Sequence, residues 1–278
     1  MNQLTEETFE KTLQAFIRTD TIDLRSVSFI DPYGMVGLLE IGELCLLEDV
    51  KKTILLPRSA EVLRYLGRMD FFSHAKRTFT LDPMQPPAVS GDVESDVLLE
   101  ITAIERARDI HDIVSRVRDR AQAILAAHLH YDERAVNGFI VALSEVCQNI
   151  IEHSENRGFV GIQKYRFPSL GKNIVKIAVM DAGIGFRRSL ASRLKLKGDL
   201  DAIEQALLHG ASRHDDEGRG HGLAAVRRFV TQWQGRLSIR SGTARLSIIP
   251  DWARGREREM HLINFPGSQI NVLLPEVS

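Results

Sequence analysis

The segment from Ala142 to Gly158, ALSEVCQNIIEHSENRG, carries polar side chains at a spacing of four residues. In a helix this spacing places Glu145, Asn149 and His153 in one nearly straight row. A carboxylate can act as a base toward water or a hydroxyl group, and an amide oxygen can bind a hard cation such as Mg²⁺. An ordinary solvated helix face explains the row equally well. An apolar stripe runs beside it, formed by Val136, Phe139, Ile140, Leu143, Val146 and Ile150.

A second group of residues lies where an apolar strand ends, in the sequence KIAVMDAGIGF. Asp181 at the end of the strand could accept a hydrogen bond from an exocyclic amine. Gly183 and Gly185 allow the backbone to approach a flat ligand closely. Because aspartate and glycine are also common in ordinary turns, the segment alone does not decide between a turn and a binding site.

A third group is the glycine run DDEGRGHGLAAV, with Gly218, Gly220 and Gly222 immediately before an expected helix. Backbone N–H groups at a helix start, preceded by flexible glycines, suit a phosphate. The P-loop pattern is absent from the chain. The spacing of a dinucleotide fingerprint occurs from Gly220 to Ala225, but a charged segment precedes it where that fingerprint needs a strand.

The elements that must position these groups follow from periodicity. We expect a strand at 96–104, helices at 109–129 and 131–155, and a hairpin at 158–181. A charged, irregular region is expected from 186 to about 222, followed by a helix at 223–233 and strands at 235–250 and 268–275. The chemistry-bearing residues therefore fall on one helix, one strand end and one helix start.

The chain before residue 80 predicts a small α/β unit. It shows a strand at 21–31, a turn from Asp31 to Gly34, a helix beginning at Met35, a strand at 51–57 and a helix capped by Ser59. Proline, glycine and acidic residues then crowd between Thr80 and Asp96, which is typical of a linker. We therefore predict two domains, at 1–82 and 96–278, joined by a linker at 83–95.

The composition limits the class of protein. The chain has 278 residues, 44% hydrophobic and 26% charged, with a net charge of −1. The charge gives no reason to expect nucleic acid or a membrane surface as partner. Cys45 and Cys147 are not in a paired spacing, which argues against a disulfide framework and favours a reducing compartment. No signal-like start or spanning apolar run is found, so we expect a cytoplasmic protein.

The order of the three groups resembles the GHKL, or Bergerat-fold, ATPase superfamily. EVCQNIIEH resembles its N box, DAGIG its G1 box and GRGHGL its G2 box, and the N box is most similar to that of the anti-sigma-factor serine kinases. The resemblance implies an α/β sandwich in which a mixed sheet is covered by helices on one face. It also implies ATP and Mg²⁺ as cofactors.

The same resemblance implies roles for individual residues. Glu145 would be the catalytic base, and Asn149 would hold Mg²⁺ on the triphosphate. Asp181 would bind the adenine amine, assisted by a hydroxyl of the last strand, Ser268. His153 would contact phosphate or the lid, although a histidine at a helix end is favourable without a function. The glycines would shape the adenine pocket and wrap the phosphates: Gly183, Gly185, Gly218, Gly220 and Gly222.

The N-terminal region resembles a STAS domain, the fold of anti-sigma-factor antagonists. Its sequence FIDPYG matches the position of the turn that carries the phosphorylated serine in that family, but Pro32 and Tyr33 replace the serines. The resemblance therefore implies a module that recruits or modulates by surface contact.

Three functions remain open from the sequence. The first is a serine/threonine protein kinase of the anti-sigma-factor type, acting on a partner such as a separate STAS protein or a sigma factor. The second is an ATP-hydrolysing conformational switch, and the third is a non-catalytic ATP-sensing module. A homodimer is compatible with each of them.

Overall fold

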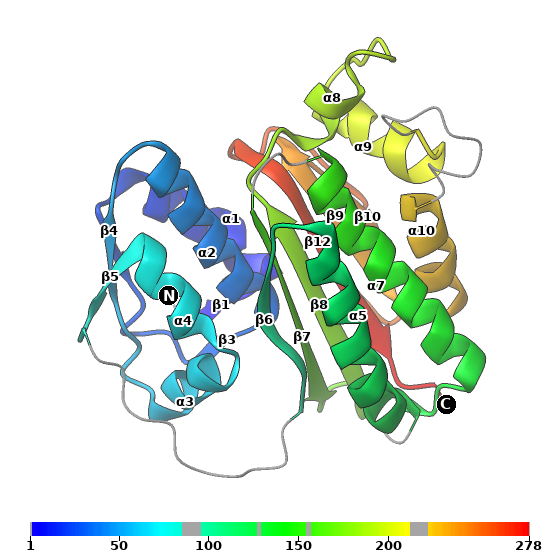
Figure 1. Cartoon of the computed structure of the whole chain (residues 1–278), viewed down its shortest axis with the longest axis horizontal. Coiled ribbons are helices and arrows are strands. Elements are labelled where there is room, and N and C mark those ends of the chain that lie inside the picture. The colour runs from blue at the N-terminus through cyan, green and yellow to red at the C-terminus, as the bar shows by residue number, and fades with distance from the viewer. Residues whose placement is uncertain (1, 85–95, 127–128, 154–156, 212–221, 278) are drawn as a thin grey trace.

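The computed structural model describes residues 2–84, 96–126, 129–153, 157–211 and 222–277. Three layers are stacked side by side in Figure 1. A central sheet has long helices on one side and the N-terminal part of the chain, residues 2–84, on the other. The fold is therefore α/β, and the described N-terminal part packs directly on the sheet.

The central sheet has seven strands in the order β11, β10, β9, β12, β8, β7, β6. Each pairing between neighbours is antiparallel, so the expectation of a mixed sheet is wrong. The reason is that β7 with β8 and β9 with β10 form hairpins, and β12 returns between β8 and β9 in the opposite direction to both. The bounds are β6 (Val97–Ile104), β7 (Gly158–Phe167), β8 (Lys172–Asp181), β9 (Arg236–Gly242), β10 (Ala244–Ile248), β11 (Arg258–Glu259) and β12 (Phe265–Pro275).

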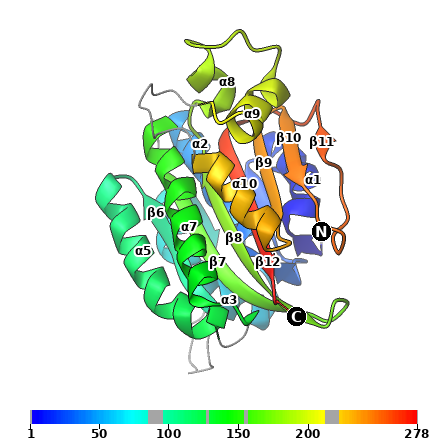
Figure 2. The same cartoon turned by 90° about the vertical axis from the view of Figure 1, so that its right-hand side faces the viewer.

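Three helices cover the front face of this sheet, as Figure 2 shows: α5 (Ala107–Ala121), α7 (Glu133–His153) and α10 (Gly222–Gln232). A π-helical turn, η1 (Gln122–Ala126), continues α5. The apolar stripe predicted on α7 is buried against the sheet, since each of its six members is at most 6% exposed. The helices expected from periodicity at these places are confirmed over their described residues.

Two further helices lie at one end of the sheet, above the ends of β8 and β9 in Figure 1. They are α8 (Gly185–Leu190) and α9 (Asp199–Leu208). The expectation of an irregular region from 186 to 222 is wrong for these residues. A signal for α9 was present, because Ala202, Ile203, Ala206 and Leu207 are spaced as one helix face and are buried.

The N-terminal part contains a parallel sheet and four helices. Strands β2 (Thr21–Asp23), β4 (Lys52–Leu55) and β5 (Phe79–Asp82) form the sheet, and β1 (Gln3–Leu4) pairs separately with β3 (Phe29–Ile30). The helices are α1 (Glu6–Arg18), α2 (Pro32–Leu47), α3 (Ala60–Arg68) and α4 (Phe71–Thr78).

The expected turn from Asp31 to Gly34 is instead the start of α2. Asp31 caps the helix by accepting a hydrogen bond from the backbone N–H of Gly34 at 2.9 Å, and Pro32 follows at the first helical position. Aspartate at the cap and proline at the first position are both favoured at helix starts. The sequence DPYG therefore begins a helix rather than reversing the chain.

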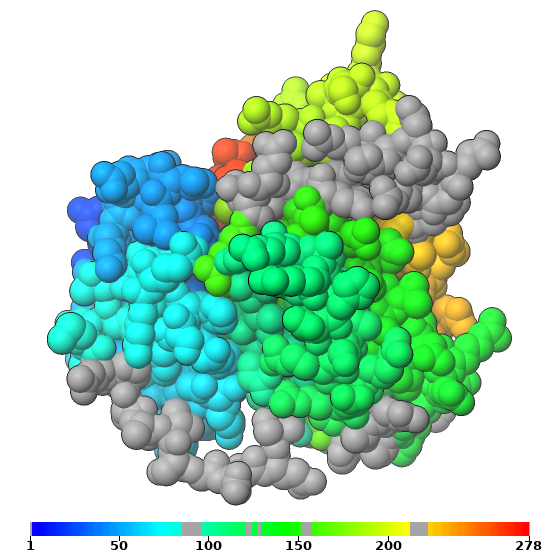
Figure 3. Space-filling model, viewed as in Figure 1, coloured from blue at the N-terminus to red at the C-terminus, as the bar shows by residue number. Residues whose placement is uncertain are grey.

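The back face of the central sheet and the N-terminal part share one hydrophobic core. Sheet residues belong to the same buried cluster as the side chains of α1, α2 and α4: Val97, Ile101, Phe159, Ala178, Met180 and Phe265. Figure 3 shows the two regions meeting closely on the visible surface. The helices α5, α7 and α10 that follow residue 96 lie on one face of the sheet, as expected, and the N-terminal part covers the other face. The domain boundaries at 82 and 96 stay a prediction, because 85–95 lie outside the described residues.

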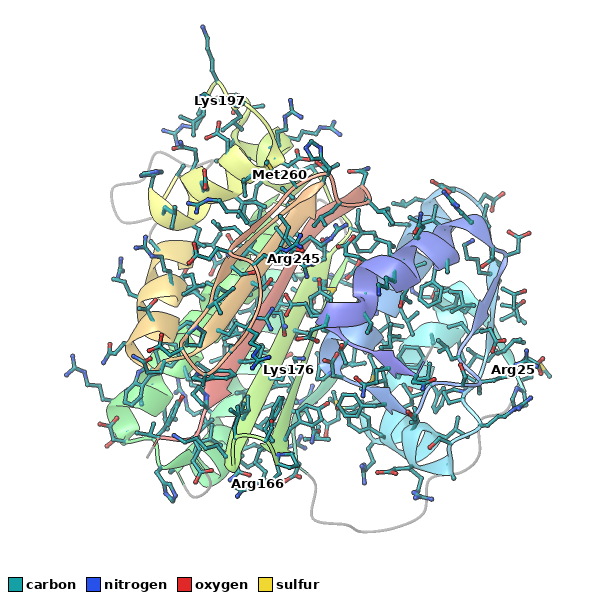
Figure 4. The ribbon with its side chains drawn as sticks, turned by 180° about the vertical axis from the view of Figure 1, so that it is seen from behind. Arg25, Arg166, Lys176, Lys197, Arg245 and Met260 are labelled. Atoms are coloured by element: carbon teal, nitrogen blue, oxygen red, sulfur yellow. The ribbon has the colours of Figure 1, made fainter. Side chains whose placement is uncertain are left out.

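Ion pairs also cross this contact, which we call the seam between the N-terminal part and the sheet. Lys176 of β8 donates to the carboxylate of Asp31, and both side chains are buried. Glu6 of α1 lies 3.4 Å from Arg236 and 3.5 Å from Arg245. Lys176 and Arg245 are labelled in Figure 4, where the seam is viewed from behind. Burial is tolerated here because the charges are paired.

In the part of the chain that the structure describes, no helix combines the length and the apolar character needed to cross a membrane.

Candidate functional site

Asp181 lies at the end of β8, in the middle of the central sheet, and is 2% exposed. Ser268 on the neighbouring strand β12 is its register partner, and its hydroxyl donates to Oδ2 of Asp181. The backbone N–H groups of Ser268 and Gly183 donate to Oδ2 and Oδ1 at 3.2 and 2.8 Å. The carboxylate is therefore held in one orientation by three donors.

Burial raises the pKa of Asp181 to about 6. The hydrogen bonds from Ser268 and Gly183 act in the other direction, because they stabilise the charged form. At neutral pH the group is thus an ionised acceptor with little solvent around it. Such a carboxylate can recognise an amine hydrogen with high selectivity, since water competes weakly for it.

Glycines give the Asp181 site its close backbone contacts. Gly267 has a φ of +78°, and a Cβ there would lie 2.0 Å from the carbonyl oxygen of Asp181. Gly185 has a φ of +70°, and its Cβ would lie 2.7 Å from Oγ of Ser241. Both positions therefore require glycine for conformation and for space. Gly185 was expected from the sequence, whereas Gly267 and Ser241 were not.

Helix α7 passes over the same end of the sheet because Gly158 gives it room. Gly158 is the register partner of Asp181 on β7, and a Cβ there would lie 2.7 Å from Ile150 of α7. Asn149 precedes Ile150 and donates from Nδ2 to the carbonyl of Glu145 at 2.7 Å. This bond leaves Oδ1 of Asn149 without a hydrogen bond in the described part of the chain. The free oxygen is the atom that a Mg²⁺ ion would need.

Glu145 lies next to the start of α10. A Cβ at Gly222, the first residue of that helix, would come within 2.5 Å of Oε2 of Glu145. The N-box helix and the end of the glycine run therefore meet at this carboxylate. A helix start offers free backbone N–H groups and a positive dipole end, so this is also where phosphates would be held.

Gly218 and Gly220 lie outside the described residues, and so does the side chain of His153, although its backbone ends α7. The structure therefore brings together Asp181, Gly183 and Ser268 at one position and Glu145 with Gly222 at another. The roles assigned to these residues stay predictions.

Two hollows lie near the central sheet. One of about 370 Å³ lies beside α8 and is lined by Gly185, Ser241 and Gly267 among others. Another, of about 710 Å³, lies along the seam and includes Lys176 and Arg236. Neither lining contains Glu145, Asn149 or Asp181, so we assign no nucleotide to them.

Comparison with known protein families agrees with this geometry. The family described as histidine kinase-, DNA gyrase B- and HSP90-like ATPase matches residues 136–275, about half of the chain. The chain belongs to this family. The matched residues include most of α7 and all of β8, α10 and β12, which carry the site. Membership implies an ATP-binding domain in this part of the protein. Comparison with curated proteins found no match.

The residues missed by the sequence analysis lie mostly behind the ATPase domain's sheet. Glu6, Glu7 and Glu10 of α1 pair with arginines of β9 and β10, but α1 itself was not expected. Its apolar spacing, Phe9, Leu13 and Phe16, was the available signal. The arginines could not have been paired with it, because the partners are more than 220 positions apart in the sequence.

Proposed function

We propose that the protein is an ATP- and Mg²⁺-dependent serine/threonine protein kinase of the anti-sigma-factor type, which regulates a separate protein. The observation that carries the proposal is the position of Glu145. Its carboxylate lies on the N-box helix, four residues before Asn149, and reaches the start of α10 where the phosphates would be held. A carboxylate there is suited to accept a proton from an attacking hydroxyl group.

The residues fit ATP and Mg²⁺ on grounds of chemistry. Asp181 is a buried, oriented acceptor for the adenine amine. Oδ1 of Asn149 has no hydrogen bond among the described residues, and Mg²⁺ in kinases takes only one or two protein oxygens beside those of the phosphates. When bound, Mg²⁺ would neutralise charge that develops on the transferred phosphoryl group.

In the proposed reaction Asp181 orients the nucleotide through its base, and Asn149 orients the metal. Glu145 takes the proton from the serine or threonine hydroxyl as that oxygen bonds to the γ-phosphorus. The bond between that phosphorus and the β,γ-bridging oxygen breaks, and ADP leaves with the electron pair. The backbone N–H groups at the start of α10 stabilise the phosphate charge.

We further propose that the N-terminal part is a STAS-like module that does not serve as phosphoacceptor. What supports this is the burial of the segment where the acceptor turn would lie: Asp31 and Tyr33 are each 1% exposed, and Asp31 pairs with Lys176. A kinase could not reach a hydroxyl placed there without separating the seam. The acceptor is therefore proposed to be a separate STAS protein or sigma factor. A homodimer of the kinase is a further proposal, and light scattering of the pure protein tests it.

The test uses pure protein with γ-labelled ATP and Mg²⁺, with and without a lysate of the source cells. A labelled band from the lysate supports the kinase if it appears only when the pure protein is added and is lost with Glu145→Ala. Free phosphate from the pure protein, with no labelled band, would assign the protein to ATP-hydrolysing switches instead. Bound ATP with neither product would make it a sensor.

A further inference from the structure

Arg240 of β9 is a wholly buried cation whose charge is balanced from the N-terminal part. Its Nε donates to Oε1 of Glu10 at 2.5 Å, and its Nη2 lies 3.3 Å from Oε2 of the same carboxylate. Glu10 belongs to α1, and Phe265 of the sheet packs edge-on against Phe9 of that helix. The guanidinium of Arg240 thus depends on the docking of α1 for its counter-charge.

The same guanidinium also holds the segment before and inside β12. Nη1 donates to the carbonyls of Gly242 and Phe265 and to Oε1 of Gln269, at 3.2, 3.4 and 3.2 Å, and Nη2 donates to the carbonyl of Ile263. One buried side chain therefore fixes residues 263 to 269 from behind the sheet.

Gln269 extends this connection to the backbone of Asp181, the residue proposed to bind the adenine amine. Its Nε2 donates to the backbone carbonyl of Asp181 at 3.2 Å and to that of Pro266 at 2.8 Å. Glu10, Arg240, Gln269 and Asp181 therefore form a continuous chain of hydrogen bonds. Three of the four are at most 2% exposed, so water offers little replacement if one bond is lost.

Ser241, the next residue of β9, holds the same segment from the front face, because successive strand residues point to opposite faces. Its hydroxyl donates to the carbonyl of Gly267 at 2.6 Å and accepts the backbone N–H of Phe186 at 3.2 Å. Gly267 precedes Ser268, which donates to the Asp181 carboxylate. Residues 240 and 241 thus hold the adenine site from both faces of the sheet.

We propose that Glu10 is a positioning residue for base recognition, acting on Asp181 and Ser268 through Arg240 and Gln269. The proposal rests on the proposed binding of ATP at Asp181. Without the Glu10 carboxylate, Arg240 would be a buried charge without its counter-ion and would have to move toward solvent. The segment from 263 to 269 would follow, and Ser268 would no longer fix the acceptor for the adenine amine.

The N-terminal part would then tune nucleotide preference without touching the nucleotide. A partner that draws α1 away from the sheet would weaken the selection of adenine, and bound ATP would favour the docked position of α1. Coupling of this kind is reciprocal by thermodynamic necessity.

The test compares Glu10→Gln with Glu7→Gln in the full-length protein. Glu7 is a matched control because it lies on the same helix and pairs at the same seam, but its partner Arg236 also has Glu6. The measurement is the affinity for ATP and for inosine triphosphate, in which a carbonyl replaces the exocyclic amine. We expect Glu10→Gln to lower the preference for ATP at least fivefold and Glu7→Gln to change it less than twofold.

A preference that stays within twofold of the parent in Glu10→Gln would overturn the proposal, even if both affinities fall together, because an equal fall reports only general loosening. If Glu10→Gln does not fold, Gln269→Met provides the same test. This variant interrupts the chain of hydrogen bonds while leaving the Glu10–Arg240 pair in place. A parent protein that binds neither nucleotide would contradict the proposed function rather than the positioning role.

Discussion

Asp181 is a buried carboxylate whose proposed role depends on its negative charge. Its pKa is raised to about 6 by burial, and the ionised form is the stronger acceptor of a hydrogen bond from an amine. Protonation below pH 6 would turn the acceptor into a donor, which suits a carbonyl on the base instead. Recognition of adenine at this site should therefore depend on pH.

We predict that the preference for ATP over inosine triphosphate falls as pH drops below about 6, by up to tenfold per unit. Titrations at pH 5, 6, 7 and 8 measure it, and the ratio cancels the titration of the phosphates themselves. In Asp181→Asn the ratio should be low and independent of pH. A constant preference across this range in the parent protein would contradict the role of Asp181.

The raised pKa of Asp181 also makes the stability of the fold depend on pH. Between the ordinary value of 3.8 and about 6, the folded state binds more protons than the unfolded state, so the free energy of unfolding falls as pH rises. The difference of about two units corresponds to about 3 kcal/mol. Asp181→Asn should remove this fall. Urea unfolding of both proteins at pH 4 and pH 7 measures this change in the free energy of unfolding. An equal change in the two proteins would refute the raised pKa of Asp181.

Glu145 is expected to separate binding from turnover. Because it acts on the proposed proton transfer rather than on the base, Glu145→Ala should keep ATP affinity within about threefold while lowering turnover at least 100-fold, in the range of general base catalysis. Nucleotide binding and phosphate transfer are measured on the same preparation. Asn149→Ala is the contrasting variant, because it should weaken the binding of ATP. Its loss of ATP affinity should not add to the loss caused by chelating Mg²⁺.

At the scale of elements, the approach of α7 to β7 and β8 places the site. Gly158 permits it, since a Cβ there would meet Ile150 at 2.7 Å and the carbonyl of Met180 at 2.6 Å. The register of β7, β8 and β12 then sets Gly158, Asp181 and Ser268 side by side. The N box and the G1 box are brought together by this packing.

Gly158→Ala should therefore destabilise the protein by about 1–3 kcal/mol, the usual cost of overpacking a tight contact. Gly198→Ala is the matched control, because nothing lies within 4 Å of its added methyl group and its φ of 171° is ordinary extended backbone. Urea denaturation of both variants measures the difference. Equal stabilities would show that α7 yields freely at this contact.

Local pattern was sufficient for the elements that carry the site. The spacing on α7 predicted this helix, and the turn-forming residues between the two strands predicted the hairpin of β7 and β8. Ser59 caps α3 as expected by accepting from the N–H of Val62. The order and direction of strands in the sheet depend on pairings across the chain, such as Ser268 with Asp181, which no local pattern contains. Helix α1 was not predicted, although Phe9, Leu13 and Phe16 are spaced as one helix face.

At the scale of the whole molecule, the N-terminal part and the ATPase domain share buried surface on the back of the sheet. Phe159, Met180 and Phe265 would be exposed to water if the N-terminal part left. Arg240 would lose Glu10, and Lys176 would lose Asp31. These losses oppose separation of the two regions much more strongly than an exposed, polar contact would.

We therefore expect calorimetry of the full chain to show one cooperative unfolding transition, with the calorimetric enthalpy equal to the van't Hoff enthalpy. Charge repulsion at the seam should lower its midpoint: Glu6→Lys would place a third cation near Arg236 and Arg245. Glu43→Lys is the control away from the seam, because Glu43 pairs with Arg77 within the N-terminal part. Two separate transitions would show that the regions unfold independently.

The alternation of Arg240 and Ser241 along β9 has a consequence for building new proteins from this one. An insertion of one residue between them would turn both side chains to the same face of the sheet, although composition and charge would hardly change. The N-terminal part likewise cannot be transferred to another protein on its own. Grafted onto another ATPase of this family, it would need an arginine and a glutamine at the positions of Arg240 and Gln269 in the recipient's sheet before it could influence the choice of base.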